Sequence, residues 1–182
     1  AIWETEAERT QSDSVQFSDL VQNLMPDFKV AAENAGLYLK VHVEEDLPAV
    51  VGDATHLGQM LDNLLGNALK FTPPGGEVKV RTELVEGKSD DEDGAVAEPT
   101  VRVEIVDSGP GVPEDYKTRI FDRFTQVHGQ KSRRRGTGLG LAFCRLAVDN
   151  HGGRIWVEDA EGEKGSVFAF TLPVYTGKAL KD

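Results

Sequence analysis

Three short motifs in a fixed order constrain what this chain can fold into. NLLGNALKF at 63–71 is followed by two glycine-rich stretches, DSGPG at 107–111 and GTGLGL at 136–141, which stand 24 residues apart. Each motif alone is weak evidence, because glycine clusters are common in turns and two asparagines four residues apart occur by chance on many helices. Their order and spacing together predict a nucleotide-binding site.

Length and composition indicate one acidic domain. The 182 residues suffice for a sizeable core, and the net charge of −11 argues against a nucleic-acid partner, although residues 117–135 concentrate positive charge. The single cysteine, Cys144, excludes an internal disulfide and favours the cytoplasm. No apolar run approaches the roughly 20 residues of a membrane-spanning helix, so we expect no direct membrane contact by this domain, whether or not its parent protein is membrane-anchored.

Apolar spacing predicts the order of helices and strands. Ser18 and Asp53 are candidate N-caps of the first two helices, Pro26 is a candidate kink and Gly36 a candidate stop. The second helix carries an apolar stripe of Leu57, Met60, Leu61, Leu64, Leu65 and Ala68. We expect helices over 18–35, 53–70 and from about 139 to the turn at 151–153, and strands near 37–43, 77–84, 100–106, 154–158 and 166–172.

This order of elements predicts an α+β fold, a two-layer sandwich. About three helices should cover one face of a mixed, mostly antiparallel sheet of about five strands. We expect residues 1–15 to be a linker, 16–175 the domain and 176–182 a tail. The acidic segment 86–98 lacks a core pattern and is expected to be a long, mobile hairpin loop.

Asn63 and Asn67 are four residues apart and therefore share one face of the second helix, with Lys70 one further turn along. This face can present an amide oxygen to a divalent cation and an ammonium group to a phosphate, and magnesium suits oxygen ligands beside phosphates. The alternative for the asparagine pair alone is two solvated side chains.

Asp107 ends an apolar strand and enters a turn in which Gly109 and Gly111 allow the backbone to approach a planar ligand. The carboxylate can accept a hydrogen bond from an exocyclic amine, which distinguishes adenine from guanine. Taken alone, the motif is also typical of a plain strand-ending turn.

GTGLGL has a GxGxG pattern, which fits neither a GxGxxG dinucleotide motif nor a P-loop. What remains is a glycine-rich helix start, whose unpaired N–H groups and positive dipole end favour phosphate. Three arginines, 133–135, stand directly before it, and one or two of them could reach a terminal phosphate. The sequence leaves open which ones do so.

With these motifs the chain resembles the catalytic, ATP-binding domain of bacterial sensor histidine kinases, in the superfamily of gyrase, Hsp90, histidine kinases and MutL. The resemblance covers about residues 18–173 and implies the Bergerat-type ATP-binding fold with a flexible ATP lid at 112–135. The matching segments are the asparagine box at 63–71, the first glycine box at 107–111, the phenylalanine box IFDRF at 120–124, the second glycine box at 136–141 and the closing segment GSVFAFTLP at 165–173.

The resemblance implies ATP and Mg²⁺ as cofactors and gives individual residues roles. Asn67 should ligate magnesium, Asn63 and Lys70 should contact phosphates, and Phe71 and Asp107 should hold adenine. Phe121 and Phe124 should be apolar anchors of the lid, and Lys70, Arg134 and Arg135 are candidate stabilisers of the transferred phosphate. Further nucleotide contacts are expected at Gly109, Gly111, Phe124, Arg135, Gly136, Thr137, Gly138, Leu139 and Gly140.

Position 63 favours phosphate transfer over hydrolysis. Superfamily members that hydrolyse ATP generally carry a glutamate there, whereas the amide of Asn63 cannot act as a general base. None of His42, His56, His128 and His151 has the sequence context of a phosphoacceptor. The expected partners are therefore the dimerisation and phosphotransfer domain of the same kinase, of which residues 1–15 would be a remnant, and a response regulator. The alternatives are another ATPase or serine kinase of the superfamily, or a non-catalytic nucleotide-binding module.

Overall fold

The computed structural model of the chain describes residues 13–87, 98–125, 140–162 and 164–176. Within these ranges, three α-helices and one short 3₁₀ helix alternate with seven strands. In chain order the elements are β1 (Asp13–Val15), α2 (Phe17–Ala35), β2 (Tyr38–Val43), β3 (Val50–Gly52), α3 (Ala54–Phe71), β4 (Glu77–Val85), β5 (Thr100–Asp107), η1 (Glu114–Tyr116), α4 (Gly140–Asn150), β6 (Arg154–Asp159) and β7 (Ser166–Pro173).

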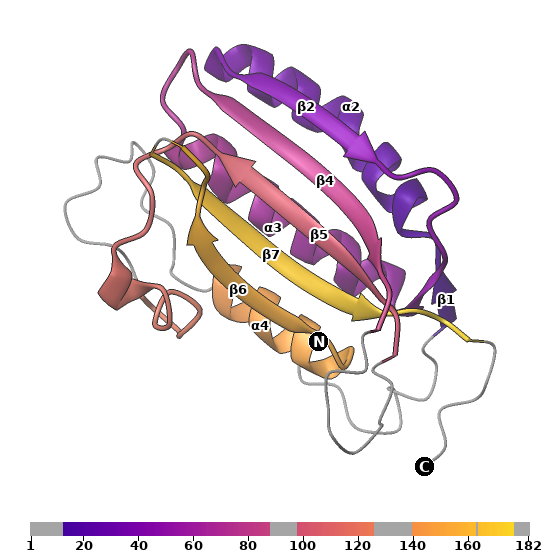
Figure 1. The fold of residues 1–182 in the computed structure, drawn as a ribbon. Coiled ribbons are helices and arrows are strands. Elements are labelled where there is room, and N and C mark those ends of the chain that lie inside the picture. The colour runs from indigo at the N-terminus through magenta and orange to yellow at the C-terminus, as the bar shows by residue number, and fades with distance from the viewer. Residues whose placement is uncertain (1–12, 88–97, 126–139, 163, 177–182) are drawn as a thin grey trace.

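Five strands form one sheet in the order β2-β4-β5-β7-β6. β2 runs parallel to β4, and the other three pairs are antiparallel. The three α-helices lie together on one face of this sheet (Figure 1). The arrangement confirms the predicted two-layer α+β sandwich with a mixed, mostly antiparallel sheet.

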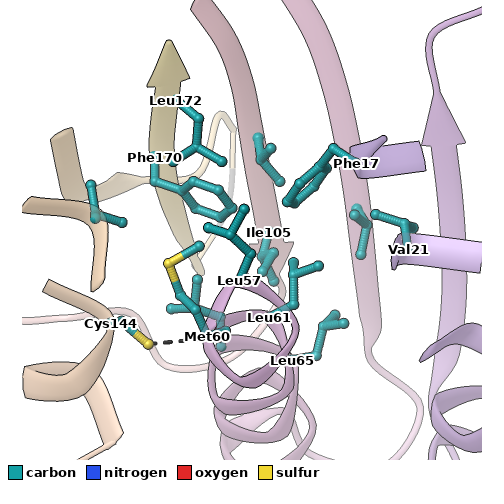
Figure 2. Packing of buried hydrophobic residues seen from close by; sticks show 14 of the residues in the cluster. Phe17, Val21, Leu57, Met60, Leu61, Leu65, Ile105, Cys144, Phe170 and Leu172 are labelled. Carbon is teal, nitrogen blue, oxygen red and sulfur yellow. Dashed lines mark hydrogen bonds between the residues drawn. The ribbon is translucent and has the colours of Figure 1, made fainter. Parts of the chain in front are cut away.

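The apolar core fills the space between the helix layer and the sheet, and α3 is its centre. All six residues of the predicted stripe on α3 are buried. Figure 2 shows Leu57, Met60 and Leu61 of this stripe near Ile105 of β5 and Phe170 of β7. The predicted N-cap is confirmed as well, because Asp53 Oδ1 accepts a hydrogen bond from the backbone N–H of His56 at 3.0 Å.

The start of α2 differs from the sequence prediction. The helix begins at Phe17 rather than after Ser18, its N-cap is Gln16, and no side chain caps it, so the prediction of a Ser18 cap is wrong. Phe17 is fully buried, and its ring packs edge to face against the ring of Phe170, with the ring centroids 5.9 Å apart. Apolar packing therefore positions this helix start. The predicted stop is confirmed, because Gly36 has a left-handed φ of 72°.

A second, two-stranded sheet was not predicted. β1 pairs antiparallel with β3, and Val15 is opposite Val50 in the register. Residues 13–15 therefore belong to a strand, which corrects the expectation that they end a linker. Val15 is buried and is part of the core, so this strand contributes to the domain itself.

Strand β2 shows the alternation expected of a half-buried strand. Leu39, Val41 and Val43 are half-buried on the helix side, whereas Tyr38 and His42 are exposed.

None of the helices in the described ranges is long and apolar enough to cross a membrane.

Candidate functional site

The asparagine face of α3 lies at the border between core and solvent. Asn63 and Asn67 are both half-buried, whereas Asp62 and Gly66 beside them are exposed. Lys70, one turn further, is half-buried, and its Nζ lies 5.2 Å from the centroid of the Phe71 ring. These side chains can therefore be reached by a ligand while the opposite face of the same helix anchors it in the core.

Asp107 is the buried carboxylate of the site, with an exposed fraction of 7%. It ends β5, where Val78 of β4 and Ser166 of β7 are its neighbours in the register. Its Oδ1 accepts a hydrogen bond from the backbone N–H of Gly109 at 2.9 Å. Burial raises the pKa of Asp107 above its usual range, and backbone hydrogen bonds from Gly109 and Ser166 oppose this shift.

The glycines around Asp107 allow three chain segments to meet without side chains between them. A Cβ on Gly109 would lie 3.0 Å from Asp107 Oδ1 and 3.1 Å from the carbonyl oxygen of Phe71. A Cβ on Gly165 would lie 2.1 Å from the carbonyl oxygen of Asp107, and Gly111 has a φ of 82°. The structure thus brings together the end of α3, the end of β5 and the start of β7, and with them Phe71, Asp107 and Gly109.

Sequence reasoning assigned no role to two hydroxyl residues beside this turn. Ser108 Oγ accepts from the backbone N–H of Glu77 at 2.8 Å, and the Ser108 N–H donates to the carbonyl of Glu77. Thr72 is buried directly after α3, and its hydroxyl lies 2.6 Å from the carbonyl oxygen of Ala68. Their signal is weak, since serine and threonine are common next to helix and strand ends. They fix the backbone that carries Phe71 and Asp107.

The second glycine box meets the asparagine box at Gly140, the first residue of α4. Asn63 Nδ2 donates toward the carbonyl oxygen of Gly140 at 3.5 Å, the long end of hydrogen-bond distances. A Cβ on Gly140 would lie 3.8 Å from the amide carbon of Asn63. The other predicted contacts of this region lie outside the described residues, namely Arg134, Arg135, Gly136, Thr137, Gly138 and Leu139.

The predicted lid is described over its first part, residues 112–125. Phe121 is buried, packs with Ile120 and Val157, and contacts Phe168 edge to face at 6.2 Å. It is an apolar anchor, as expected. Phe124 is not an anchor in this structure, because 71% of it is exposed and its φ is 61°, which is uncommon for a residue other than glycine.

An ion pair fixes the same segment to the edge strand of the sheet. Lys117 Nζ lies 3.0 Å from Asp159 Oδ1 at the end of β6, and it also pairs with Glu114. These hydrogen bonds to Glu114 and Asp159 raise the pKa of Lys117. The segment that leads into the rest of the predicted lid is therefore held at two places, by the Phe121 cluster and by this lysine.

Comparison with known proteins decides the family. Residues 52–176 match the model of the histidine kinase-, DNA gyrase B- and HSP90-like ATPases, and the match includes both asparagines, Asp107 and Gly140. The chain belongs to this family of ATPases. Within this ATPase family its relatives are sensor kinases. The adaptive-response sensory kinase SasA of Rippkaea orientalis is 35% identical over 155 residues, which are 85% of this chain and 36% of that protein.

A second SasA, from Synechococcus sp. strain CC9311, is 40% identical over 136 residues, 75% of this chain and 32% of the relative. The chain thus spans about a third of the length of these two curated relatives. Among solved structures, the catalytic domain of the histidine kinase ThkA is 30% identical with a TM-score of 0.72, and 90% of this chain covers 96% of it. The mycobacterial sensor histidine kinase MprB has a TM-score of 0.69 at 27% identity, with coverages of 90% and 97%. Within the ATPase family the chain is therefore an ATP-binding catalytic domain of the histidine kinase type.

Proposed function

We propose that this domain binds Mg-ATP and presents the terminal phosphate to a histidine on the dimerisation domain of the same kinase. From there the phosphate would pass to an aspartate of a response regulator. One observation carries the proposal: a buried carboxylate, Asp107, is held by Gly109 against the end of the helix that bears Asn63 and Asn67. A reducing compartment, the cytoplasm, is the location that we propose.

Asp107 is the adenine-recognising group in this proposal. Its Oδ1 is already oriented by the Gly109 N–H, so the carboxylate has a fixed direction and can accept from the exocyclic amine of adenine. Guanine has a carbonyl oxygen at that position, which two carboxylate oxygens would repel. Phe71 lies beside this turn through its backbone contact with Gly109, which supports a role near the base.

The phosphates would lie toward the other half of α3. Asn63 and Phe71 are eight residues apart, so they are about 12 Å apart along the helix axis. Asn63 contacts Gly140 at the first turn of α4, where unpaired N–H groups of a helix favour phosphate. Asn67 lies between these two residues in α3, and its amide oxygen would hold a magnesium ion, which would neutralise phosphate charge. Lys70 would neutralise phosphate charge.

The reaction would be transfer rather than hydrolysis. The amide of Asn63 cannot take a proton from water, so the domain would act by positioning the nucleotide and neutralising its charge. The attacking imidazole would come from the dimerisation domain. A solved ShkA is in complex with AMPPNP, and a solved ThkA is in complex with the response regulator TrrA. Both complexes support the nucleotide and the partner that we propose for this chain.

Asp107→Asn tests the adenine site. The new amide would keep its oxygen on the Gly109 N–H and turn its NH₂ group toward the amine of adenine, so we expect ATP affinity to fall about tenfold or more. Isothermal titration calorimetry would measure it, with Asp62→Asn as the control because Asp62 is an exposed carboxylate on α3. Equal ATP affinity in Asp107→Asn and in the wild type would refute the site.

Asn67→Ala tests the metal role separately. The wild type should bind ATP more tightly with Mg²⁺ than with EDTA, and the variant should lose most of that difference. A variant that keeps the full magnesium dependence would exclude Asn67 as the ligand. In the full-length kinase, the same variant should form little phosphohistidine, whereas sustained release of inorganic phosphate by the wild-type domain alone would favour an ATPase instead.

A further inference from the structure

His151 joins the end of α4 to the beginning of α3. Its Nε2 accepts a hydrogen bond from the backbone N–H of Asp53, the N-cap of α3, at 3.0 Å. Its Nδ1 lies 2.6 Å from the carbonyl oxygen of Ala147, one turn earlier in α4. A carbonyl can only accept, so Nδ1 carries the hydrogen and Nε2 is free to accept. Both contacts together require the neutral ring in its Nδ1–H tautomer.

The ring occupies a tight space. A Cβ on Gly52 of β3 would lie 2.7 Å from His151 Cδ2, and a Cβ on Gly153 would lie 1.9 Å from the carbonyl oxygen of Thr171 in β7. Gly152, which lies between His151 and Gly153 in the sequence, has a φ of 74°. The end of α4 is therefore fitted between β3 and β7, with the His151 ring against Gly52.

The other contacts between the two helices follow the same antiparallel register. Cys144 Sγ donates to the carbonyl oxygen of Met60 at 3.6 Å, as Figure 2 shows, and Gly140 meets Asn63 at the far end. His151 thus fixes one end of an 11-residue helix whose other end lies at the asparagine box. α3 and α4 lie side by side over this length (Figure 1).

We propose that His151 is a positioning residue for phosphate binding. By holding α4 in register with α3, it sets the position along the α3 axis at which the first turn of α4 lies beside Asn63. This inference rests on the proposed function, because it assumes that phosphates bind at that turn. His151 is far from the ligand in this proposal and acts only through the placement of Gly140.

The proposal predicts a selective loss. In the proposed function, the adenine end of the site depends on Asp107 and Gly109. Their described contacts include Phe71, Val78, Gly165 and Ser166, and none is with His151. Displacement of α4 should therefore weaken binding of nucleotides that carry phosphates and spare adenosine. Small misplacements of binding groups have large effects, so we expect His151→Leu to lower ATP affinity about tenfold while adenosine affinity stays within about twofold.

His151→Gln is the matched rescue variant. Its side-chain oxygen can stand near the position of Nε2 and accept from the Asp53 N–H, so ATP affinity should return to within about threefold of the wild type. Calorimetry would measure the affinity for ATP, and NMR titration would measure the affinity for adenosine. Thermal melts would establish that each variant is folded at the measuring temperature, because His151→Leu removes a tertiary hydrogen bond.

Three results would overturn the inference. Equal losses for ATP and adenosine would mean that His151 only maintains the fold, and unchanged ATP affinity in a folded His151→Leu would mean that α4 keeps its register without it. A long-range ¹H–¹⁵N spectrum of the wild type showing the Nε2–H tautomer would contradict the two contacts, even if His151→Leu failed to fold. The proposed function is tested separately, because it fails if the wild type binds neither ATP nor adenosine.

Discussion

The buried carboxylate of Asp107, which we propose binds adenine, lowers the stability of the fold at neutral pH. Burial raises the pKa of this carboxyl group, so the folded protein disfavours the charged form. Because the folded pKa is higher than the unfolded one, the protonated carboxyl stabilises the fold, and this contribution is complete below the pKa of an unfolded aspartate, about 3.9. The contribution is lost as pH rises through the folded pKa. At neutral pH the ionised group therefore makes the fold less stable than a neutral one would.

Asp107→Asn should separate binding from stability. The asparagine oxygen can still accept the hydrogen bond from the Gly109 N–H, while the buried charge is removed. We therefore expect the free energy of unfolding at pH 7 to be unchanged or higher. Urea unfolding would measure it beside the loss of ATP affinity proposed above. A clear loss of stability together with the loss of affinity would mean that Asp107 is needed for the fold rather than for the base.

Cys144 gives a prediction at alkaline pH. Burial raises the pKa of this thiol to about 12. Its stabilising contribution is complete below the pKa of an unfolded cysteine, about 8.5, and decreases as pH rises from there toward the folded value. At pH 10.5 the wild type should have lost about 2–3 kcal/mol relative to pH 8 from this group alone.

The control is Cys144→Ala, which lacks the ionisable group and should lose less stability over the same interval, whatever its stability at pH 8. Urea unfolding at both pH values measures this difference. A native thiol that reacts with a disulfide reagent at pH 8 as fast as the unfolded one would contradict the buried, protonated state, because only the thiolate attacks.

Among the elements, α3 carries both the core stripe and the asparagine face. Gly66 lies on its exposed side, where an added Cβ would meet nothing within 4 Å. Gly66→Ala should stabilise the domain by about 1 kcal/mol, because alanine is the better helix former. The contrasting variant is Gly153→Ala, whose Cβ would lie 1.9 Å from the Thr171 carbonyl oxygen and should destabilise by about 1–3 kcal/mol.

Urea unfolding of both glycine variants would test whether the local geometry is correct. If Gly66→Ala destabilised the protein, α3 would have a neighbour on its exposed side. Unchanged stability in Gly153→Ala would mean that β7 and the end of α4 are not in close contact. Gly66→Ala also provides a stabilised background in which damaging variants of the site remain folded.

The elements also show what sequence can predict. α3 was predictable because its cap at Asp53 and six apolar residues at helical spacing agree with each other. β1 and β3 were not, since strands of three residues are too short to show an alternation. The start of α2 depends on the ring of Phe17 against Phe170, a contact between residues far apart in sequence, whereas Ser18 offered a local signal that proved wrong.

The same distinction holds for the candidate site. The motifs pointed to Asp107 because glycines at a strand-ending turn are visible in sequence, and to both asparagines because their four-residue spacing puts them on one face of a helix. They could not give the exposure of Phe124, nor the hydrogen bond between His151 and Asp53, which joins residues 98 positions apart. Such contacts depend on tertiary packing and have no local pattern.

In the whole molecule, strand β1, which directly precedes α2, is part of the domain. β1 pairs with β3, and β3 leads directly into Asp53, the residue that His151 contacts. Val15 is buried in the core with an exposed fraction of 7%. Strand β1, the cap of α3 and the end of α4 therefore lie together in one region, away from Asp107.

Removal of residues 1–15 should test this arrangement. The shortened protein loses burial of Val15, worth about 2 kcal/mol, which corresponds to a melting temperature about 4–8 °C lower for a domain of this size. A chain that begins at residue 13 keeps β1 and should melt like the full chain, as expected if residues 1–12 are a linker. Adenosine affinity should be equal in both, because Asp107 and Gly109 are unaffected. Equal melting temperatures for the two shortened chains would mean that β1 adds nothing to stability and that α2 begins the folded unit.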